Sequence, residues 1–239
     1  MNTTTLITAT GLQKRYGSGP AGVTALDGVD IEVAAGELLA ISGRSGSGKT
    51  TLLHCLSGIT TPDAGTIHFD GIDLTAAGDP GRTELRAKRM AFVFQQLNLL
   101  PALTVAENVE LPLVLRGDDA TAIRSASATV LERVGLEDRR DALPANLSGG
   151  EQQRVAVARA LIGQPDIVWA DEPTGALDTA TSLEVMNLFR GAVDAGLTVV
   201  CVSHSPDIAD IADRVLVMSD GRIAPPPPLR ADHPMEATT

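Results

Sequence analysis

The chain is poor in aromatic residues, in cysteine and in basic residues. Aromatic residues make up 3% of its 239 residues, so the hydrophobic 44% must form a core from Val, Leu, Ile and Ala. The two cysteines, Cys55 and Cys201, lie in apolar stretches, and we expect buried thiols in a reducing cytosol rather than a disulfide. The 19 basic residues are outnumbered by 30 acidic ones, which disfavours a broad nucleic-acid surface but not local phosphate binding.

Long hydrophobic runs are also lacking. No apolar stretch reaches the roughly 18 residues that a membrane-spanning helix needs. The first five residues are polar and do not resemble a signal peptide. We therefore expect any role at a membrane to depend on a partner protein.

What the sequence does contain is an alternation of predicted strands and helices, which is typical of an α/β fold with a parallel sheet covered on both faces. Strand patterns at 6–9, 29–33 and 37–42 come first, and Asp70-Gly71 predicts a tight hairpin turn. Helical patterns at 105–115 and 120–134 predict a second lobe, with breakers at Pro101, Pro112, Gly117, Gly135 and Pro144. The alternation then resumes with helix 150–162, strand 167–170, helix 180–194, strand 198–203, helix 206–212 and strand 215–218.

The first of two glycine-rich loops, residues 43–50, matches the phosphate-loop pattern G-x-x-x-x-G-K-[ST]. Its glycines let the backbone approach phosphates without Cβ clashes. Lys49 offers a charge to the β- and γ-phosphates, and Thr50 offers a hydroxyl to Mg²⁺. The alternative is a plain flexible turn, which the strand–loop–helix context argues against.

The second glycine-rich loop, Leu147-Ser-Gly-Gly-Glu-Gln-Gln-Arg154, also opens a predicted helix. Ser148, Gly149 and Gly150 offer a hydroxyl and backbone N–H groups to an anion. Because the first loop already holds the phosphates of its own chain, we expect the second to face the nucleotide of a neighbouring copy. The plainer interpretation is a helix cap, with Ser148 as N-cap and Glu151 as its capping-box partner, and both can hold at once.

Two carboxylates follow the buried strand 167–170. Ligands of open α/β sheets bind at the carboxyl ends of the strands, so Asp171 is expected to hold Mg²⁺ and Glu172 to polarise the attacking water. The alternative is an acidic helix N-cap.

His204 follows another buried strand at the same predicted edge and is expected to reach the γ-phosphate, although a lone histidine is more often structural. The other histidines are interpreted as structural or surface residues.

Gln95 and Tyr16 are weaker candidates on their own. Gln95 follows a short strand and opens the second lobe, where its amide can contact Mg²⁺ or water and couple the nucleotide state to the position of the lobe. Tyr16 is the only tyrosine and is expected on an early loop, where it can stack on adenine. Taken alone, it would be an ordinary surface aromatic residue.

Taken in order along residues 6–223, these motifs resemble the nucleotide-binding domain of ABC transporters. The resemblance implies a P-loop NTPase (RecA-like) α/β core with an N-terminal antiparallel β subdomain and a small helical subdomain. One domain would span 5–224, with 5–96 and 147–224 as core and β subdomain, 97–146 as helical subdomain, and 225–239 as a Pro-rich disordered tail. Glu172 would be the catalytic base, His204 the γ-phosphate switch, and Gln95 the reporter to the membrane subunits and a contact of Mg²⁺ with Thr50 and Asp171. ATP would contact Tyr16, Gly43, Arg44, Ser45, Gly46, Ser47, Gly48, Lys49, Thr50, Thr51, Ser148, Gly149, Gly150 and Asp178.

Finer motifs around 92–109 and 171–178 resemble the branch that serves macrolide export, lipoprotein release and cell division. That branch implies ATP-driven homodimerisation, Mg²⁺-dependent hydrolysis and a four-helix permease with a large extracytoplasmic domain, at the cytoplasmic face of the cell membrane. No nucleic-acid partner is expected. The alternative is a soluble ABC-type ATPase of DNA repair or translation, but no long insertion or second cassette is present. The sequence does not indicate the transported substrate or the direction of transport.

Overall fold

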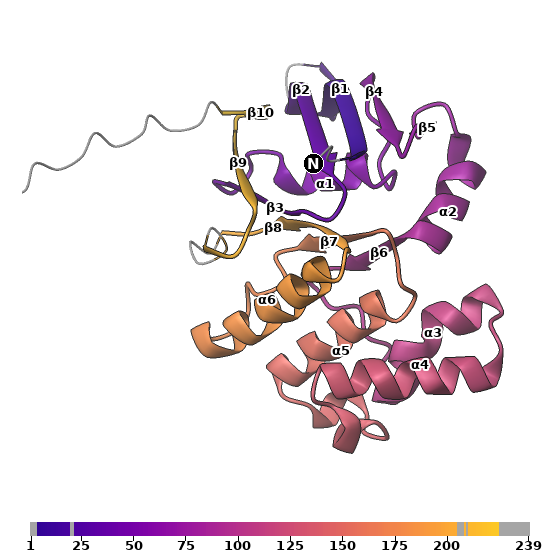
Figure 1. Cartoon of the computed structure of the whole chain (residues 1–239). Coiled ribbons are helices and arrows are strands. Elements are labelled where there is room, and N and C mark those ends of the chain that lie inside the picture. Colours follow the sequence, from indigo (N-terminus) through magenta and orange to yellow (C-terminus); the bar gives the residue numbers. More distant parts are fainter. Residues whose placement is uncertain (1–3, 20–21, 205–207, 209, 225–239) are drawn as a thin grey trace, which may run out of the picture.

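The structure is a computed structural model that describes residues 4–19, 22–204, 208 and 210–224 (Figure 1). The predicted tail lies outside the described residues, as do residues 206, 207 and 209 of the helix expected over 206–212.

The core is a six-stranded sheet in the order β10-β9-β3-β8-β7-β6. All neighbouring strands run parallel except β10, which is antiparallel to β9. The fully buried central strands carry Val, Ile, Leu, Ala and Cys on both faces, as expected for a sheet that is covered on two sides. The strands are β3 (Leu38–Gly43), β6 (Met90–Val93), β7 (Ile167–Asp171), β8 (Thr198–Val202), β9 (Arg214–Ser219) and β10 (Arg222–Ile223).

A second sheet is antiparallel and lies over one face of the core, with helix α1 (Lys49–Leu56) between the two (Figure 1). Its order is β2-β1-β4-β5, and the Asp70-Gly71 hairpin turn is confirmed between β4 and β5. Tyr16 is the last residue of β1 and does not lie on a loop as expected, because β1 continues pairing with β2 up to Val23. The bounds are β1 (Thr5–Tyr16), β2 (Val23–Ala34), β4 (Ala64–Phe69) and β5 (Ile72–Asp73).

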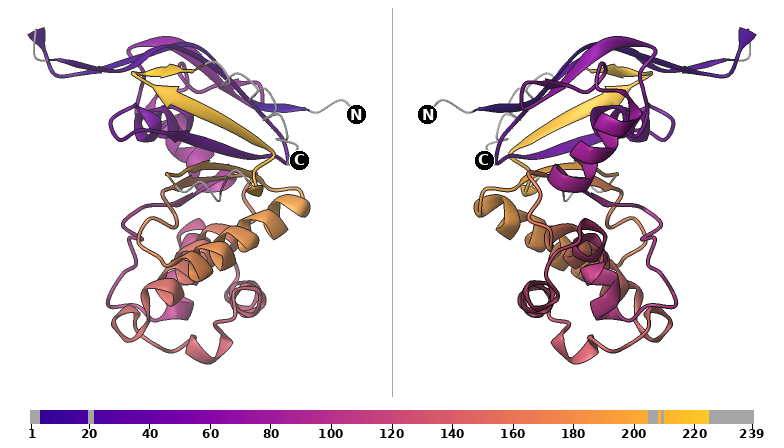
Figure 2. Two further views of the ribbon diagram at one scale, coloured as in Figure 1. Left: turned by 90° about the vertical axis from the view of Figure 1, so that its left-hand side faces the viewer. Right: turned by 90° about the vertical axis from the view of Figure 1, so that its right-hand side faces the viewer.

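Helices α5 (Gly149–Leu161) and α6 (Thr179–Asp194) cover the opposite face of the core sheet. Beyond them lie α3 (Val105–Arg116) and α4 (Ala120–Arg133), which share a hydrophobic cluster with α5 (Figure 2). The expected break at Pro112 is absent, since α3 runs through this residue. Proline inside a helix costs about 3 kcal/mol, which the burial of Val109 and Leu113 on either side offsets.

Three further observations concern the cysteines, membrane-spanning helices and one additional helix. Both cysteines are buried free thiols. Among the residues that the structure describes, no helix combines the length and the apolarity that a bilayer crossing requires. One helix was not expected: α2 (Gly78–Arg89) connects β5 to β6.

Candidate functional site

The first glycine-rich loop joins the end of β3 to the start of α1, as its pattern predicts. The backbone of Gly48 is left-handed, and a Cβ there would lie 2.2 Å from the carbonyl oxygen of Ala25. Only glycine fits this position. The free N–H groups at the N-terminus of α1 therefore open directly onto the loop, where they favour an anion.

Lys49 is the cation of this loop. Its side chain is 95% buried, and Nζ donates hydrogen bonds of 3.0 Å to the carbonyl oxygens of Gly43 and Arg44. The pKa of Lys49 is lowered by burial, and the negative charges of Glu172 and Asp171 offset this shift only in part. The buried Oγ of Ser47 has no hydrogen-bond partner within the described part of the chain. A buried cation and an unpaired hydroxyl in one loop fit a polyanionic ligand.

Asp171 ends strand β7 and meets the start of α1. Thr50 Oγ1 donates a hydrogen bond of 3.1 Å to Asp171 Oδ1. Burial raises the pKa of Asp171, which the hydrogen bond from Thr50 opposes. A buried carboxylate beside a hydroxyl supplies hard oxygen donors, and Mg²⁺ typically uses only one or two such protein oxygens together with phosphate oxygens and water. These residues therefore fit the Mg²⁺ that the first loop implies, although no group of three or more His, Cys, Asp or Glu with metal-site geometry occurs among the described residues.

Glu172 connects the other two predicted catalytic residues. Gln95 Nε2 donates a hydrogen bond of 2.9 Å to Glu172 Oε2, and His204 Nε2 lies 2.8 Å from Glu172 Oε1. The backbone of Glu172 is left-handed, with φ 47°, and its N–H donates to Val202 O at 2.9 Å. The turn after β7 thus places Glu172 where three residues from distant parts of the sequence meet.

A cavity of about 460 Å³ joins these groups. Tyr16 and Val23 form one end and are 46% and 64% exposed. The predicted residues that line the cavity are Tyr16, Ser45, Gly46, Gly48, Lys49, Thr50, Thr51, Gln95, Glu172 and His204. Val23 and Ala25 also line it, and they could not be predicted from the sequence because they carry no polar group.

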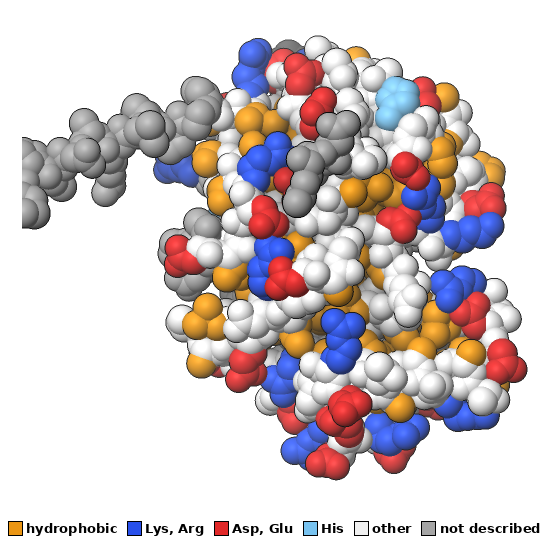
Figure 3. Space-filling model, in the orientation of Figure 1, with side chains coloured by type: hydrophobic (Ala, Val, Ile, Leu, Met, Phe, Trp, Pro, Cys, Tyr) orange, Lys and Arg blue, Asp and Glu red, His pale blue; other side chains and the backbone are white. Residues whose placement is uncertain are grey.

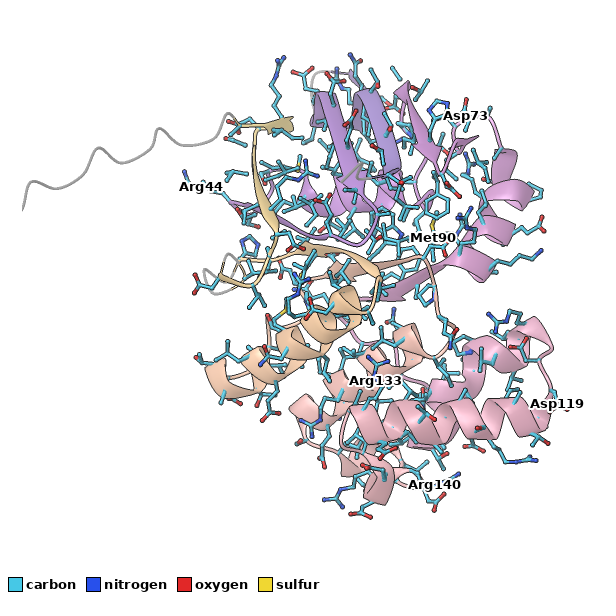
Figure 4. All side chains as sticks on the ribbon, viewed as in Figure 1. Arg44, Asp73, Met90, Asp119, Arg133 and Arg140 are labelled. Carbon is cyan, nitrogen blue, oxygen red and sulfur yellow. The ribbon has the colours of Figure 1, made fainter. Side chains whose placement is uncertain are left out.

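Arg44 does not line this cavity. Its side chain is exposed and directed outward from the loop (Figure 4). No hydrogen bond or ion pair involving that side chain occurs in the described part of the chain. Its expected contact with ATP therefore stays a prediction.

The second glycine-rich loop lies apart from the cavity. Ser148 caps α5 in a complete capping box, because its Oγ accepts from Glu151 N at 3.3 Å and its N–H donates to Glu151 Oε2 at 2.8 Å. This confirms the helix-cap interpretation. Ser148 and Gly149 are exposed, and neither lines the cavity. Their expected contact with the nucleotide of another copy stays a prediction.

Asp178 is also outside the cavity and caps α6. Its carboxylate accepts from the backbone N–H of Thr181 at 3.0 Å and from the Thr181 hydroxyl at 2.8 Å. A Cβ on Gly150 would lie 2.5 Å from Thr181 Cγ2, so the starts of α5 and α6 are packed together. Ser148 to Gly150 and Asp178, none of which lines the cavity, thus belong to two adjacent helix starts.

Arg159, near the end of α5, was not singled out by the sequence. Its guanidinium donates to the carbonyl oxygens of Leu97 and Asn98 at 2.6 and 2.8 Å. Burial lowers the pKa of Arg159. Helix α5 is therefore tied to the segment that follows Gln95.

Comparisons with known proteins agree with this geometry. The family model for ABC transporters matches residues 26–175. The lipoprotein-releasing system ATP-binding protein LolD of Bordetella pertussis is 43% identical over 215 residues, which are 90% of this chain and 93% of LolD. The macrolide export ATP-binding/permease protein MacB of Nitrosomonas europaea is 44% identical over 91% of this chain, which spans 33% of MacB.

A solved structure gives the same answer for the fold. The ATP-binding cassette MJ0796, in a dimeric post-hydrolysis state bound to ADP and Pi, superimposes with a TM-score of 0.84. It is 36% identical, and the match covers 91% of this chain and 96% of that one. The expected P-loop NTPase fold is confirmed, and nothing in the comparisons supports the alternative of a repair or translation ATPase.

The family match covers well over half of the chain, and the relatives align with nearly its whole length. The chain belongs to the ABC transporter family and is an ATP-binding, ATP-hydrolysing subunit of such a transporter.

Proposed function

We propose that two copies of this chain enclose two MgATP molecules at a shared interface and pass the resulting motion to a separate membrane permease. The observation that carries the proposal is the placement of Glu172. It lies at the cavity beside Lys49, between Gln95 and His204, whereas Ser148 is exposed elsewhere on the same chain.

Each half of the cavity suits one part of ATP. Tyr16 and Val23 offer an exposed aromatic and apolar surface on which adenine can stack. Lys49 and the N–H groups of the loop bind the phosphates, with the ammonium released from the Gly43 and Arg44 carbonyls. Thr50, Asp171 and Gln95 would hold Mg²⁺, which would neutralise charge on the phosphates when bound.

Hydrolysis needs a base beside the terminal phosphate. Glu172 accepts the proton of the attacking water, since its carboxylate is 22% exposed and free to accept more than the two contacts it has. His204 donates to the γ-phosphate, and Gln95 positions both the water and the carboxylate. Gln95 and His204 both contact Glu172, so the three residues act together.

A dimer explains the position of the second loop. Ser148, Gly149 and Asp178 are exposed, and none of them lines the cavity of its own chain. A two-fold axis brings such a surface against the cavity of the other copy, and each ATP then lies between unlike loops. The dimeric state of the relative MJ0796 supports this arrangement.

A groove of about 490 Å³ supports a membrane partner. It lies among α2, β6, α3 and α5, and its apolar side chains include Phe92, Pro112 and Leu115, the last 79% exposed. Hydrophobic side chains gather in the indentation where α2 faces α3 (Figure 3). Arg86, Lys88, Arg116 and Arg159 outnumber Glu84 around it. The occupant is a cytoplasmic helix of the permease with an apolar face and acidic residues.

The names of the relatives indicate the kind of permease. LolD is named for lipoprotein release and MacB for macrolide export. We assign the partner to this branch: a four-helix permease with a large extracytoplasmic domain, with the present chain at the cytoplasmic face of the cell membrane.

Phosphate release at increasing protein concentration tests the central part of the proposal. The rate should rise with the square of the concentration while the chain is mostly monomeric, because two copies must meet to hydrolyse ATP. A rate that stays linear in protein concentration throughout the monomeric range would contradict the shared site.

For the groove, Leu115→Glu should abolish co-purification with the permease and leave the hydrolysis of the isolated chain unchanged.

A further inference from the structure

Two turns of this chain have the same sequence and nearly the same backbone but different surroundings. Asp70-Gly71 joins β4 to β5, and Asp220-Gly221 joins β9 to β10. The φ angles are 48° and 77° in the first turn and 50° and 76° in the second. A Cβ on Gly71 would meet nothing within 4 Å, whereas a Cβ on Gly221 would lie 3.0 Å from the carbonyl oxygen of Ala25.

The second turn contacts the phosphate loop. Strand β9 pairs with β3 as far as Gly43, which lies opposite Met218. The chain then turns, and the N–H of Gly221 donates a hydrogen bond of 3.1 Å to the carbonyl oxygen of Ser47. The carbonyl of Gly221 accepts from Asp27 N at 2.9 Å, which fixes the turn to β2. Residues 218–221 therefore form the outer support of the loop.

Ala25 closes the gap between the turn and the loop. Its carbonyl oxygen is the atom that a Cβ on Gly48 would approach to 2.2 Å, and it is also the nearest atom to a Cβ on Gly221. A side chain at position 221 requires Ala25 or the turn itself to shift by a few tenths of an ångström. Either movement changes the support of Ser47, two residues before Lys49.

We propose that Gly221 is a positioning residue for ATP binding: its N–H and its lack of a side chain hold Ser47 and the following N–H groups of the phosphate loop in the geometry that binds phosphate. This inference rests on the proposed function. Binding sites need their groups placed to within about 0.5 Å, and no other backbone N–H in the described part of the chain donates to the Ser47 carbonyl. Gly221 contacts no substrate and acts only through the loop.

Gly221→Ala and its matched control Gly71→Ala test the inference. Both variants place alanine in the same left-handed turn and so carry the same backbone strain, and only Gly221→Ala adds the close approach to Ala25. A fluorescent ATP analogue is titrated at protein concentrations at which the chain is monomeric, so that neither dimerisation nor hydrolysis contributes. Gly221→Ala should raise the Kd about threefold to tenfold, the range expected for one lost or distorted hydrogen bond. Gly71→Ala should leave it unchanged.

Kinetics separate positioning from a general structural defect. In Gly221→Ala the KM for ATP should rise with the Kd, while kcat at saturating ATP stays within about twofold, because Glu172 and His204 lie on other elements. Arg222→Ala removes the exposed ion pair with Asp27 but keeps the backbone bond, so its Kd should match the wild type.

Equal Kd values for Gly221→Ala and Gly71→Ala would overturn the inference, as would a larger loss in Arg222→Ala than in Gly221→Ala. If Gly221→Ala does not fold, the pair Gly221→Asn and Gly71→Asn gives the same comparison, since asparagine tolerates the left-handed backbone. A wild-type chain that does not bind the analogue would instead refute the proposed function.

Discussion

Glu172→Gln is the substitution that separates catalysis from binding in the proposed site. The change replaces one carboxylate oxygen by an amide and removes the negative charge. The remaining oxygen can still accept the hydrogen bond from Gln95, which measures 2.9 Å in the wild type. The amide cannot accept a proton from water. The variant therefore loses the base and keeps the shape of the site.

The size of the effect follows from the role of each group. A positioned general base contributes about 10²- to 10⁴-fold to the rate, so kcat should fall by that factor, or about 3–5 kcal/mol. The groups proposed to bind ATP, Lys49, Thr50 and Tyr16, lie elsewhere around the cavity. Affinity for ATP should stay equal or increase, because one negative charge near the terminal phosphate is gone. Stability should change by less than about 1 kcal/mol, since the contact with His204 is partly exposed.

Phosphate release and light scattering after size exclusion measure both effects. With ATP and Mg²⁺, the variant should elute at twice the mass of the 24.8 kDa chain and show no sustained hydrolysis. Glu132→Gln, on the exposed face of α4, is the control for the same chemical change and should behave as the wild type. Hydrolysis by Glu172→Gln within tenfold of the wild type would refute the assigned base, and elution as a monomer at high concentration would refute the ATP-bound dimer.

Three further predictions test other parts of the molecule. Lys49→Ala should weaken ATP binding at least about tenfold, the value of a charged hydrogen bond; an unchanged Kd in a titration would contradict its role. Ser148→Ala should lose about 1 kcal/mol of stability with the helix cap, whereas Ser148→Asp keeps the cap and stability but should abolish hydrolysis by repelling the triphosphate of the partner; wild-type hydrolysis by Ser148→Asp would exclude the contact between copies. Burial raises the pKa of the Cys55 thiol to about 11 and that of Cys201 as well, so thiolate is scarce below that pH. Ellman's reagent should titrate both thiols at pH 8 only after denaturation, and rapid labelling of the native chain would show that they are accessible.

Local patterns in the sequence were sufficient for most of the fold. The central strands are short apolar runs bounded by polar or glycine-rich segments, and their helices have recognisable caps, as at Ser148 and Asp178. Helix α2 was not predicted because it is strongly polar and only Arg82 is buried in it, so it shows no apolar periodicity. The prediction for strand β1 stopped too early. Irregular pairing near Leu12 interrupts the alternation of buried and exposed residues on which that prediction depended.

The site was predictable where a residue's own chemistry marks it. Glu172 and His204 carry charged or polar groups at the ends of buried strands, Lys49 follows another such strand in a recognisable phosphate loop, and the parallel sheet brings those ends together. Val23 and Ala25 carry no such mark and line the cavity only because β2 passes beside α1. The contact of Gly221 with Ser47 depends on β9 lying next to β3 in the sheet, an order that no local pattern encodes.

The bonds from Arg159 to the Leu97 and Asn98 carbonyls have a mechanical consequence. One end of α5 presents Ser148 at the surface, and the other end anchors the segment that begins at Gln95. Helix α5, which is 13 residues long, thus connects Ser148 at the surface to the segment that follows Gln95. Because Arg159 holds Leu97 and Asn98, we expect a tilt of α5 to move this segment and to change the distance between Gln95 and Glu172.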